Sequence, residues 1–302
     1  MKQTPKVICV AGATGSGKSA IAAQLGRDTG GVVINMDSRQ VYADFPIITA
    51  QPGESETALC PHLLYGFLPS TQSISAGSYT VKVSELIKKV ITEGKQPILV
   101  GGTGLYFKAL MHGIANIPQI PKDIHDKWQQ ECATLGSIAL HATLQQQDPE
   151  YAAKIHPHDR QRITRALEVY DFTGKTFSMW HATSRSSVPF NFVYLGLDIS
   201  LKELEPGLYK RIDIMLANGA IDEAKAALQN CADSKSPGWS GIGCAELYKY
   251  LHGNLSLEEA KELWYKNTRA YAKRQLTWFR GQPDIVWYKP CNYENFLKAV
   301  KN

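Results

Sequence analysis

The stretch GATGSGKSA, from Gly12 to Ala20, decides the expected fold of this 302-residue chain. It fits the pattern G-x-x-x-x-G-K-[ST], with Gly12, Gly17, Lys18 and Ser19 at the fixed positions. An apolar run precedes it and a helical pattern follows, which predicts a strand, a loop and a helix. In this geometry, backbone N–H groups converge on phosphate oxygens at a helix N-terminus. The stretch therefore predicts a phosphate site, against the alternative of a glycine-rich turn without a ligand.

Composition and charge restrict the class of protein. The chain is 44% apolar and 20% charged with a formal net charge of +5, which permits a polyanionic partner without requiring one. Its six cysteines show no C-x-x-C spacing, so neither a zinc site nor a disulfide framework is expected. The sequence shows no signal pattern and no apolar run long enough to cross a bilayer. We expect a cytoplasmic protein that does not bind a membrane.

The order of apolar runs predicts an α/β fold. Short runs bounded by turn residues occur at KVICV, GVVINM, QPILVGG and FNFVYLGLDI. The helical patterns between them are typical of a mostly parallel sheet that is covered on both faces. Between Gly113 and Pro189 the strand signal disappears and helical patterns take over. The sequence therefore predicts a P-loop core from residues 1–113, a helical insertion domain from residues 114–189, and completion of the core with C-terminal helices by residues 190–302.

Two further segments place polar side chains directly after predicted strands. Asp37 follows a buried run in VVINMDSRQVY, and Thr103 lies among glycines in PILVGGTGLY. Ligands of open α/β sheets collect at the carboxyl ends of the strands. Asp37 could hold Mg²⁺ through water or accept a proton from a nucleophile, and Thr103 could offer a hydroxyl group. The alternative for Asp37 is the N-cap of a helix over SRQVY.

Two predicted helices carry clusters of basic residues. In IHPHDRQRITRALEVY, Asp159 caps a helix whose first turns contain three arginines, against the preference of the helix dipole. An anionic partner would explain this arrangement. In the helix from Leu257 to about Arg280, helical spacing puts Lys266, Arg269, Lys273 and Arg280 on one side, opposite the aromatic residues. This cationic stripe is either a solvated face or a contact for a phosphate backbone.

Five motifs together resemble one known family. GATGSGKS, DSRQVY, GGTGLYFKAL, IHPHDRQRITRALEVY and TRAYAKRQLTWFRG resemble, in this order, the tRNA dimethylallyltransferases, and the resemblance runs from about Val7 to Gly281. It implies transfer of a dimethylallyl group from dimethylallyl diphosphate to the exocyclic amine of the adenosine 3′-adjacent to the anticodon in tRNA, with release of diphosphate. Mg²⁺ is the implied cofactor, the tRNA anticodon stem-loop and dimethylallyl diphosphate are the implied partners, and a monomer is the implied state.

The resemblance also implies roles for individual residues. Asp37 is similar to the family's catalytic base, while Thr103 and Arg211 match positions near the diphosphate and the acceptor base. Lys18 would stabilise the leaving diphosphate and Ser19 would ligate the metal. Diphosphate binding is implied for Gly12, Ala13, Thr14, Gly15, Ser16, Gly17, Lys18 and Ser19. Contact with tRNA is implied for Asp37, Ser38, Arg39, Gln40, Thr103, His125, Gln161, Arg162, Ile163, Thr164, Arg165 and Lys273.

The chain departs from the family pattern at a few positions in the expected tRNA-contacting segments. His125 stands where an arginine often stands, and Gly207 aligns with another arginine. Ser240, Cys244 and Ala245 replace residues that are often basic or part of a Gly-Tyr pair. None of these departures affects the phosphate loop or Asp37.

Two rival functions remain open from the sequence. A small-molecule or nucleotide kinase would use the phosphate loop and an aspartate after the second strand equally well. It would, however, give no role to the arginine-rich helix and the cationic stripe. A non-catalytic P-loop RNA-binding protein is the third reading, and it would tolerate the loss of Asp37.

Overall fold

The computed structural model describes residues 5–115, 117–182 and 190–301. It divides into two compact units, which we name the core unit, Met1–Phe107 with Val188–Asn302, and the helical unit, Lys108–Ser187. The predicted insertion domain spans residues 114–189, and its end at residue 189 lies outside the described residues. Within the described ranges, no helix combines the length and the hydropathy needed to cross a membrane.

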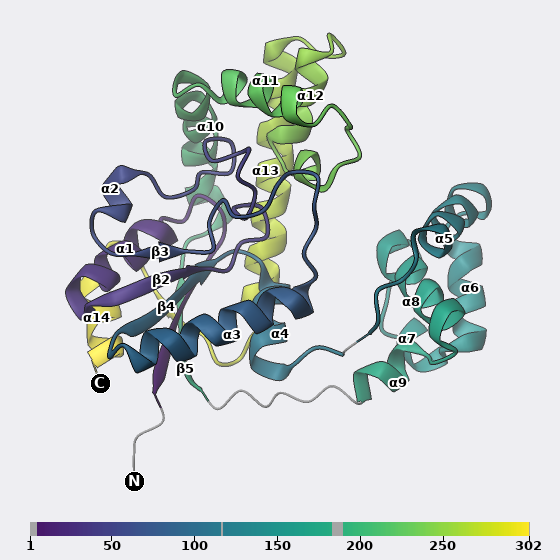
Figure 1. The fold of residues 1–302 in the computed structure, drawn as a ribbon, viewed down its shortest axis with the longest axis horizontal. Helices are drawn as coiled ribbons and strands as arrows, with labels where there is room; N and C mark the ends of the chain where they lie inside the picture. Colours follow the sequence, from purple (N-terminus) through teal and green to yellow (C-terminus); the bar gives the residue numbers. More distant parts are fainter. Residues whose placement is uncertain (1–4, 116, 183–189, 302) are drawn as a thin grey trace. The chain divides into compact units, whose positions relative to one another are not determined.

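The core unit is built on one six-stranded sheet in which every neighbouring pair of strands is parallel. The strand order is β3-β2-β4-β1-β5-β6 (Figure 1). The strands are β1 (Lys6–Ala11), β2 (Gly31–Asn35), β3 (His62–Leu63), β4 (Gln96–Gly101), β5 (Asn191–Leu197) and β6 (Val286–Tyr288). The prediction of a parallel α/β sheet is confirmed.

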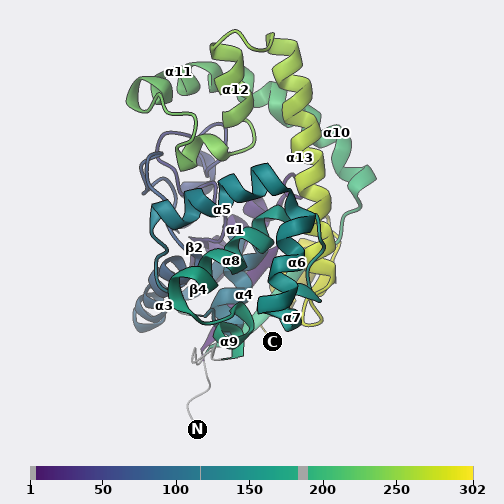
Figure 2. The ribbon, with the colours of Figure 1, turned by 90° about the vertical axis from the view of Figure 1, so that its right-hand side faces the viewer.

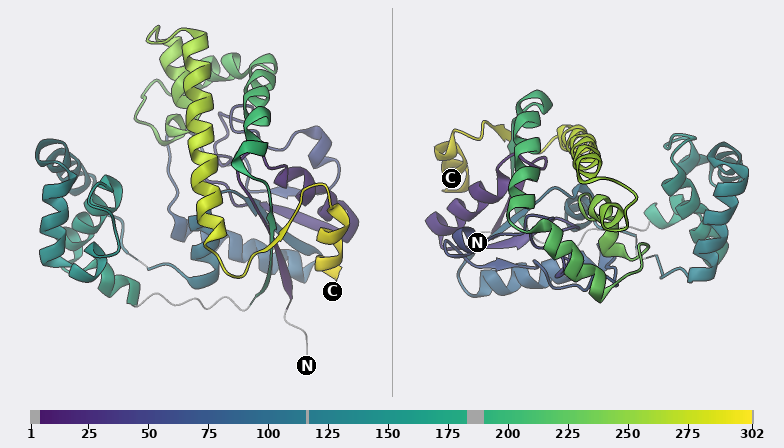
Figure 3. Two further views of the ribbon diagram at one scale, coloured as in Figure 1. Left: turned by 180° about the vertical axis from the view of Figure 1, so that it is seen from behind. Right: turned by 90° about the horizontal axis from the view of Figure 1, so that it is seen from above.

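Helices cover both faces of this sheet. On one face, alternate strand residues such as Ile8 and Val10 pack against α1 (Lys18–Thr29) and α14 (Tyr293–Lys301) in one buried cluster. On the other face lie α3 (Ala76–Thr92), α4 (Gly104–His112) and α13 (Leu257–Arg280), as the views in Figure 3 show. Phe107 of α4 packs edge-on against both Tyr194 of β5 and Phe279 of α13. Because both faces are buried, the strands read as continuous apolar runs.

Three further helices of the core unit follow β5. They are α10 (Leu201–Ala217), α11 (Ala220–Asn230) and α12 (Cys244–Leu251), and shorter turns occur at α2 (Glu54–Thr57) and η1 (Pro237–Ser240). Capping boxes begin α10 at Ser200 and α13 at Ser256. A buried cluster that includes Leu208 of α10, Leu276 of α13 and Ala13 joins these two helices to the segment after β1. Both helices thus reach the predicted phosphate loop.

The helical unit has its own apolar core. Its helices, which are labelled in Figure 2, are α5 (Lys122–Leu135), α6 (Ser137–Gln147), α7 (Pro149–Ala152), α8 (Arg160–Thr173) and α9 (Phe177–Ala182). Leu140, Leu144, Ile163 and Leu167 are buried together. The predicted N-cap of α8 is confirmed, because the Asp159 carboxylate accepts a hydrogen bond from Arg162 N at 3.1 Å.

Candidate active site at the carboxyl edge of the sheet

The phosphate loop, residues 12–17, connects the end of β1 to the first turn of α1. Gly15 and Gly17 have φ angles of 79° and 86°, a backbone conformation that favours glycine. A Cβ atom on Gly12 would come within 2.7 Å of Ser16 Oγ. That Ser16 hydroxyl is buried and has no hydrogen-bond partner, although buried polar groups are normally paired. The loop therefore presents an unsatisfied polar group where a phosphate oxygen could bind.

Lys18 is the first residue of α1, and the charges of Asp37 and Arg211 act on its ammonium group. Its Nζ donates a hydrogen bond to Ala13 O at 3.4 Å. Burial lowers the pKa of Lys18 to about 8; Arg211 also lowers it, and Asp37 raises it. Burial likewise lowers the pKa of Arg211, on α10, while Asp37 raises it. The structure thus brings together three residues that the sequence analysis assigned to catalysis, and two half-buried cations near one carboxylate favour an anionic ligand.

Asp37 is held by local hydrogen bonds just beyond β2. Asn35 Oδ1 accepts from Asp37 N at 2.7 Å, and Asn35 Nδ2 donates to Asp37 O at 3.0 Å. The Asp37 carboxylate accepts from Arg39 N at 2.9 Å. No helix begins in this described segment, where residues 38–41 form bends and turns. The alternative reading of Asp37 as a helix N-cap is therefore wrong, since its carboxylate closes a local turn instead.

Thr103 lies in the glycine loop, residues 101–104, between β4 and α4. Its hydroxyl accepts from Ser38 N at 2.9 Å and donates to Ser38 Oγ at 3.2 Å. Thr103 N also donates to Met36 O at 3.2 Å. A Cβ atom on Gly101 would clash with the Met36 backbone, so only glycine permits this close approach. The glycine loop and the Asp37 segment are thereby fixed against each other.

Gln275 of α13 is a site residue that the sequence analysis did not select. Its Oε1 accepts a hydrogen bond from Thr14 N at 2.8 Å, and its Nε2 donates to Gly102 O at 2.9 Å. The side chain thus joins the phosphate loop to the glycine loop. The resemblance motif TRAYAKRQLTWFRG contains this glutamine, but only the fold brings it to the two loops.

The other predicted tRNA contacts in the core unit differ in their surroundings. Arg39 Nη1 donates to Ser240 Oγ at 2.8 Å, so one of the departures from the family pattern is itself an arginine partner. Gln40 Nε2 donates to the carbonyl oxygens of Thr49 at 3.1 Å and of Ala50 at 2.5 Å. The amide of Gln40 therefore supports the following loop. Lys273 is exposed on α13.

The cationic stripe of α13 lies where helical spacing predicted it. Lys266, Arg269, Lys273 and Arg280 are exposed, whereas Trp264 and Phe279 are buried. Tyr271 and Trp278 are half-buried on the site-facing side. Arg269 forms an ion pair with Glu205 at 2.7 Å, which leaves three exposed cations of the stripe outside this pair. Whether the stripe contacts a phosphate backbone stays a prediction.

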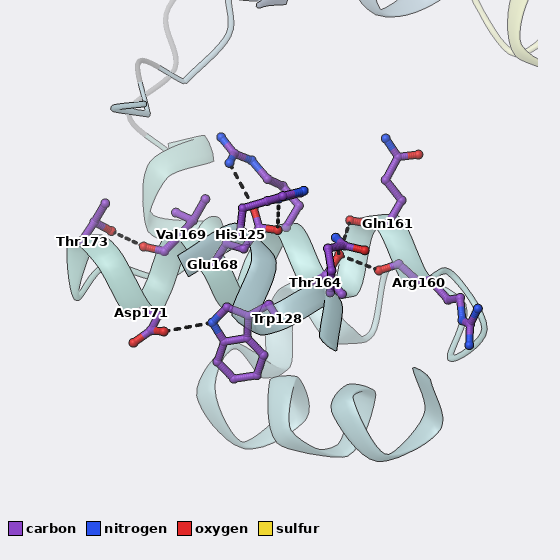
Figure 4. A network of polar contacts seen from close by, with 11 residues as sticks. His125, Trp128, Arg160, Gln161, Thr164, Glu168, Val169, Asp171 and Thr173 are labelled. Carbon is purple, nitrogen blue, oxygen red and sulfur yellow. Dashed lines mark hydrogen bonds and ion pairs between the residues drawn. The ribbon is translucent and has the colours of Figure 1, made fainter. Parts of the chain in front are cut away.

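In the helical unit, the predicted tRNA contacts surround a buried carboxylate on α8 (Figure 4). Glu168 has a side chain that is only 2% exposed, and it accepts from His125 Nδ1 at 2.7 Å. Its other oxygen pairs with Arg165 Nη1 at 3.3 Å. One buried acid thus orients two of the predicted contacts, including the histidine that stands in place of an arginine.

Other predicted contacts on α8 divide between the surface and the core. Gln161 and Arg162 are exposed, and the Gln161 side chain points away from the neighbouring helices in Figure 4. Arg162 pairs with Asp159 at 3.5 Å. Ile163 is fully buried, and Thr164 is 2% exposed and accepts from Gln129 Nε2 at 3.3 Å. The tRNA contacts predicted at Ile163 and Thr164 stay predictions, but both side chains are buried, and Ile163 belongs to the apolar core of the unit.

The oxygen groups near the phosphate loop suit Mg²⁺ bound together with a phosphate ligand. Mg²⁺ in phosphate sites keeps several water ligands and is held by one or two protein oxygens plus the phosphates. Ser19 lies in the first turn of α1, and the Asp37 carboxylate acts electrostatically on Lys18 next to it. Among the described residues, no three His, Cys, Asp or Glu side chains gather as a metal site. This donor set fits a metal that arrives with its anionic ligand.

Comparison with known proteins identifies relatives along the whole chain. The family model described as IPP transferase matches residues 40–282. A tRNA dimethylallyltransferase from Desulfovibrio desulfuricans is 53% identical over 294 residues, which cover 97% of this chain and 91% of that protein. A tRNA dimethylallyltransferase from Nitratidesulfovibrio vulgaris (strain DP4) is 52% identical over 298 residues, with 99% and 96% covered.

Two solved structures of transferases also match nearly the whole chain. A tRNA isopentenylpyrophosphate transferase from Bacillus halodurans matches with a TM-score of 0.71 and 32% identity, covering 98% of this chain and 95% of that chain. A eukaryotic dimethylallyltransferase described as acting on tRNA matches with a TM-score of 0.76 and 29% identity, covering 99% of this chain and 77% of that chain.

Proposed function

This chain belongs to the IPP transferase family of tRNA dimethylallyltransferases, and from this premise we propose its reaction and its site. The enzyme transfers a dimethylallyl group from dimethylallyl diphosphate to the exocyclic amine of the adenosine 3′-adjacent to the anticodon in tRNA. Diphosphate and one proton are released. The observation that supports this site most directly is that Lys18, Asp37 and Arg211 interact electrostatically beside the phosphate loop.

The phosphate loop binds the diphosphate of the donor. As the allylic carbon–oxygen bond breaks, the electron pair of that bond goes to the leaving diphosphate. Lys18, Arg211 and the amides of the loop stabilise the growing negative charge, because preorganised donors in a partly dry site cost no reorganisation during the reaction. Mg²⁺, held by Ser19 together with diphosphate oxygens, would supply further charge neutralisation when it is bound.

The acceptor amine forms the new carbon–nitrogen bond. Its lone pair is drawn into the adenine ring, so the amine is a weak nucleophile and must lose a proton as it bonds to carbon. Asp37 accepts this proton and later releases it to water. Thr103, which is fixed to Ser38 by two hydrogen bonds, orients the acceptor. A stacked adenine is inaccessible, so the base must leave the anticodon loop before it reacts.

The tRNA contacts proposed for the enzyme come from both units. In the core unit they are the segment Asp37 to Gln40, Thr103 and Lys273; in the helical unit they are His125 and residues 161–165. The enzyme works in the cytoplasm. It works as a monomer, since the proposed roles are all assigned within one chain. Sedimentation equilibrium with and without tRNA tests the monomer.

A filter assay with tRNA, Mg²⁺ and labelled donor tests the reaction. Label transferred to tRNA from dimethylallyl diphosphate supports the proposal, and a tRNA substrate with guanosine in place of the acceptor adenosine should receive none. If label enters an acceptor only from γ-labelled ATP, the kinase reading replaces it. If tRNA binds but no label is transferred from either donor, the protein is an RNA-binding module.

A further inference from the structure

The side chain of Gln275 connects three segments that lie far apart in the sequence. Gln275 belongs to α13 and is 4% exposed. Its Oε1 accepts from Thr14 N in the phosphate loop at 2.8 Å, across 261 positions of the chain. Its Nε2 donates to Gly102 O in the glycine loop at 2.9 Å, across 173 positions. One neutral amide therefore connects the phosphate loop to the glycine loop that contains Thr103.

Only an amide satisfies both loops at once. Thr14 N–H requires an acceptor and Gly102 C=O requires a donor, and a glutamine side chain carries one of each. A glutamate would place a carboxylate against the Gly102 carbonyl, and a leucine would offer no hydrogen-bond partner to either backbone group. Glycine at position 102 makes this contact possible, because a Cβ atom there would collide with Gln275 Nε2.

The neighbouring residues of α13 strengthen this connection. Burial raises the pKa of Tyr271, one turn earlier in α13, to about 12. Side-chain hydrogen bonds with Thr103 and with Gln275 itself act on this pKa in the opposite direction. Trp278 packs so closely on the glycine loop that a Cβ atom on Gly104 would collide with its ring. One face of α13 is therefore in direct contact with both loops. Displacement of either loop relative to the other would require Gln275 to break a buried hydrogen bond.

We propose that Gln275 is a positioning residue that fixes the phosphate loop relative to the glycine loop, so that the allylic carbon of the donor and the acceptor amine meet at bonding distance. This inference rests on the proposed function. Transfer reactions depend steeply on the alignment of the two reactants, and a misplacement of about 1 Å can cost about 100-fold in rate. Gln275 contacts neither reactant; it acts through Thr14 and Gly102, in the way outer ligands orient a metal site.

The test compares Gln275→Leu and Gln275→Glu with the wild type and with Gln282→Leu as a matched control. Gln282 is half-buried, and its side chain donates to Trp278 O at 3.1 Å rather than to a backbone group of either loop. Three quantities are measured: the Kd of magnesium diphosphate without tRNA, the Kd of tRNA without donor, and the single-turnover rate of prenyl transfer. Circular dichroism at the assay temperature establishes that each variant is folded.

We expect both Gln275 variants to bind magnesium diphosphate about 10-fold more weakly and to transfer about 100-fold more slowly, with tRNA affinity within twofold of wild type. Gln282→Leu should match the wild type in all three. Unchanged diphosphate affinity and rate would overturn the proposal. An equal loss of tRNA binding would also overturn it, since that indicates general unfolding of α13. Diphosphate binding needs no prenyl group or tRNA, so it tests Gln275 even if the wild type transfers no label.

A double-mutant cycle provides the second test, one that does not depend on the stability of a single variant. Gly102→Ala should be severely impaired, because its Cβ atom meets Gln275 Nε2. Gln275→Ala removes that obstacle. In the double variant, diphosphate affinity should therefore be at least fivefold better than the product of the two single effects predicts. Strict additivity would show that the two side chains do not act through this contact, and the proposal would fail.

Discussion

Lys18 carries a half-buried charge beside the phosphate loop, and the first prediction concerns this charge. Lys18→Ala removes a preorganised cation from the leaving diphosphate, so the turnover should fall by about two to three orders of magnitude, by analogy with oxyanion-hole donors worth about 2.7 to 4 kcal/mol. Steady-state prenyl transfer to tRNA measures this effect, with Lys154→Ala, an exposed lysine of the helical unit, as the control. A variant that retains turnover within a few-fold of wild type would remove Lys18 from the site.

The pKa of Lys18 also predicts a dependence on pH. Because burial lowers this pKa to about 8, the ammonium of the ligand-free protein loses its proton as the pH rises through 8, well below the ordinary value. The affinity for magnesium diphosphate should therefore be constant near pH 7 and should weaken above pH 8. Titration calorimetry measures it, and the ratio to Lys18→Ala at each pH cancels the titration of diphosphate itself. A constant ratio up to pH 10 would contradict the assignment.

Asp37→Asn separates the role of a base from the role of a metal ligand. The amide keeps the size of the side chain but cannot take the proton of the acceptor amine, so the single-turnover rate should fall by about 10² to 10⁴ while the affinity for tRNA changes little. A titration with Mg²⁺ should not restore the rate. Substantial recovery at high Mg²⁺, together with weaker diphosphate binding, would instead make Asp37 mainly a metal-positioning residue.

The residues of the site were predictable to different degrees, for physical reasons. Lys18 and Asp37 could be identified because a local motif and the end of a buried run place them at the sheet edge. The two contacts of Gln275 could not be predicted, since its hydrogen bonds span 261 and 173 positions and its own motif indicates neither partner. Conversely, the resemblance implies tRNA contact for the whole segment from Gln161 to Arg165, and it cannot separate Ile163, whose side chain is fully buried, from the exposed residues beside it.

At the scale of elements, α8 carries the prediction about tRNA binding. Arg165 is oriented by buried Glu168, and Arg162 is exposed next to the helix N-cap. Arg162→Ala and Arg165→Ala should each weaken tRNA binding and reduce the slope of log K against log salt by about 0.7 to 0.9 for each phosphate that the variant no longer binds. The affinity for magnesium diphosphate should not change. Filter binding at several salt concentrations decides this, with Lys154→Ala as a surface control. An unchanged slope in both variants would leave α8 a solvated face.

Long elements followed from sequence patterns, and short ones did not. Four strands and the long helix α13 could be predicted because apolar runs and helical spacing extend over several residues. The edge strands β3 and β6 have two and three residues, too few for a pattern, and they exist because a neighbouring strand pairs with them. The segment after Asp37 was open to a helical reading, but its glutamine and arginine side chains bind distant backbone and hydroxyl groups instead.

At the scale of the molecule, the chain has two separate apolar cores. The sheet cluster around Ile8 and Val10 belongs to the core unit, and the cluster around Leu167 belongs to the helical unit. A separate core means that truncation of a buried side chain in one unit destabilises that unit first. If the diphosphate site belongs to the core unit alone, damage to the helical unit should leave donor binding intact.

Leu167→Ala tests whether the helical unit can be destabilised without loss of donor binding by the core unit. Leu167 is fully buried, so its truncation should cost about 2 to 5 kcal/mol of unfolding free energy within the helical unit. Hydrogen exchange should become faster in α5, α6 and α8 but not in β1 and β4. Magnesium diphosphate should still bind within twofold of wild type, whereas tRNA should bind at least 10-fold more weakly, because α8 no longer holds its arginines in place. Leu25→Ala, at a fully buried position of α1, is the matched control and should accelerate exchange in the core unit instead. Equal acceleration of β1 and β4 by Leu167→Ala would mean that the two cores unfold as one, and retained tRNA affinity would remove the helical unit from the interface.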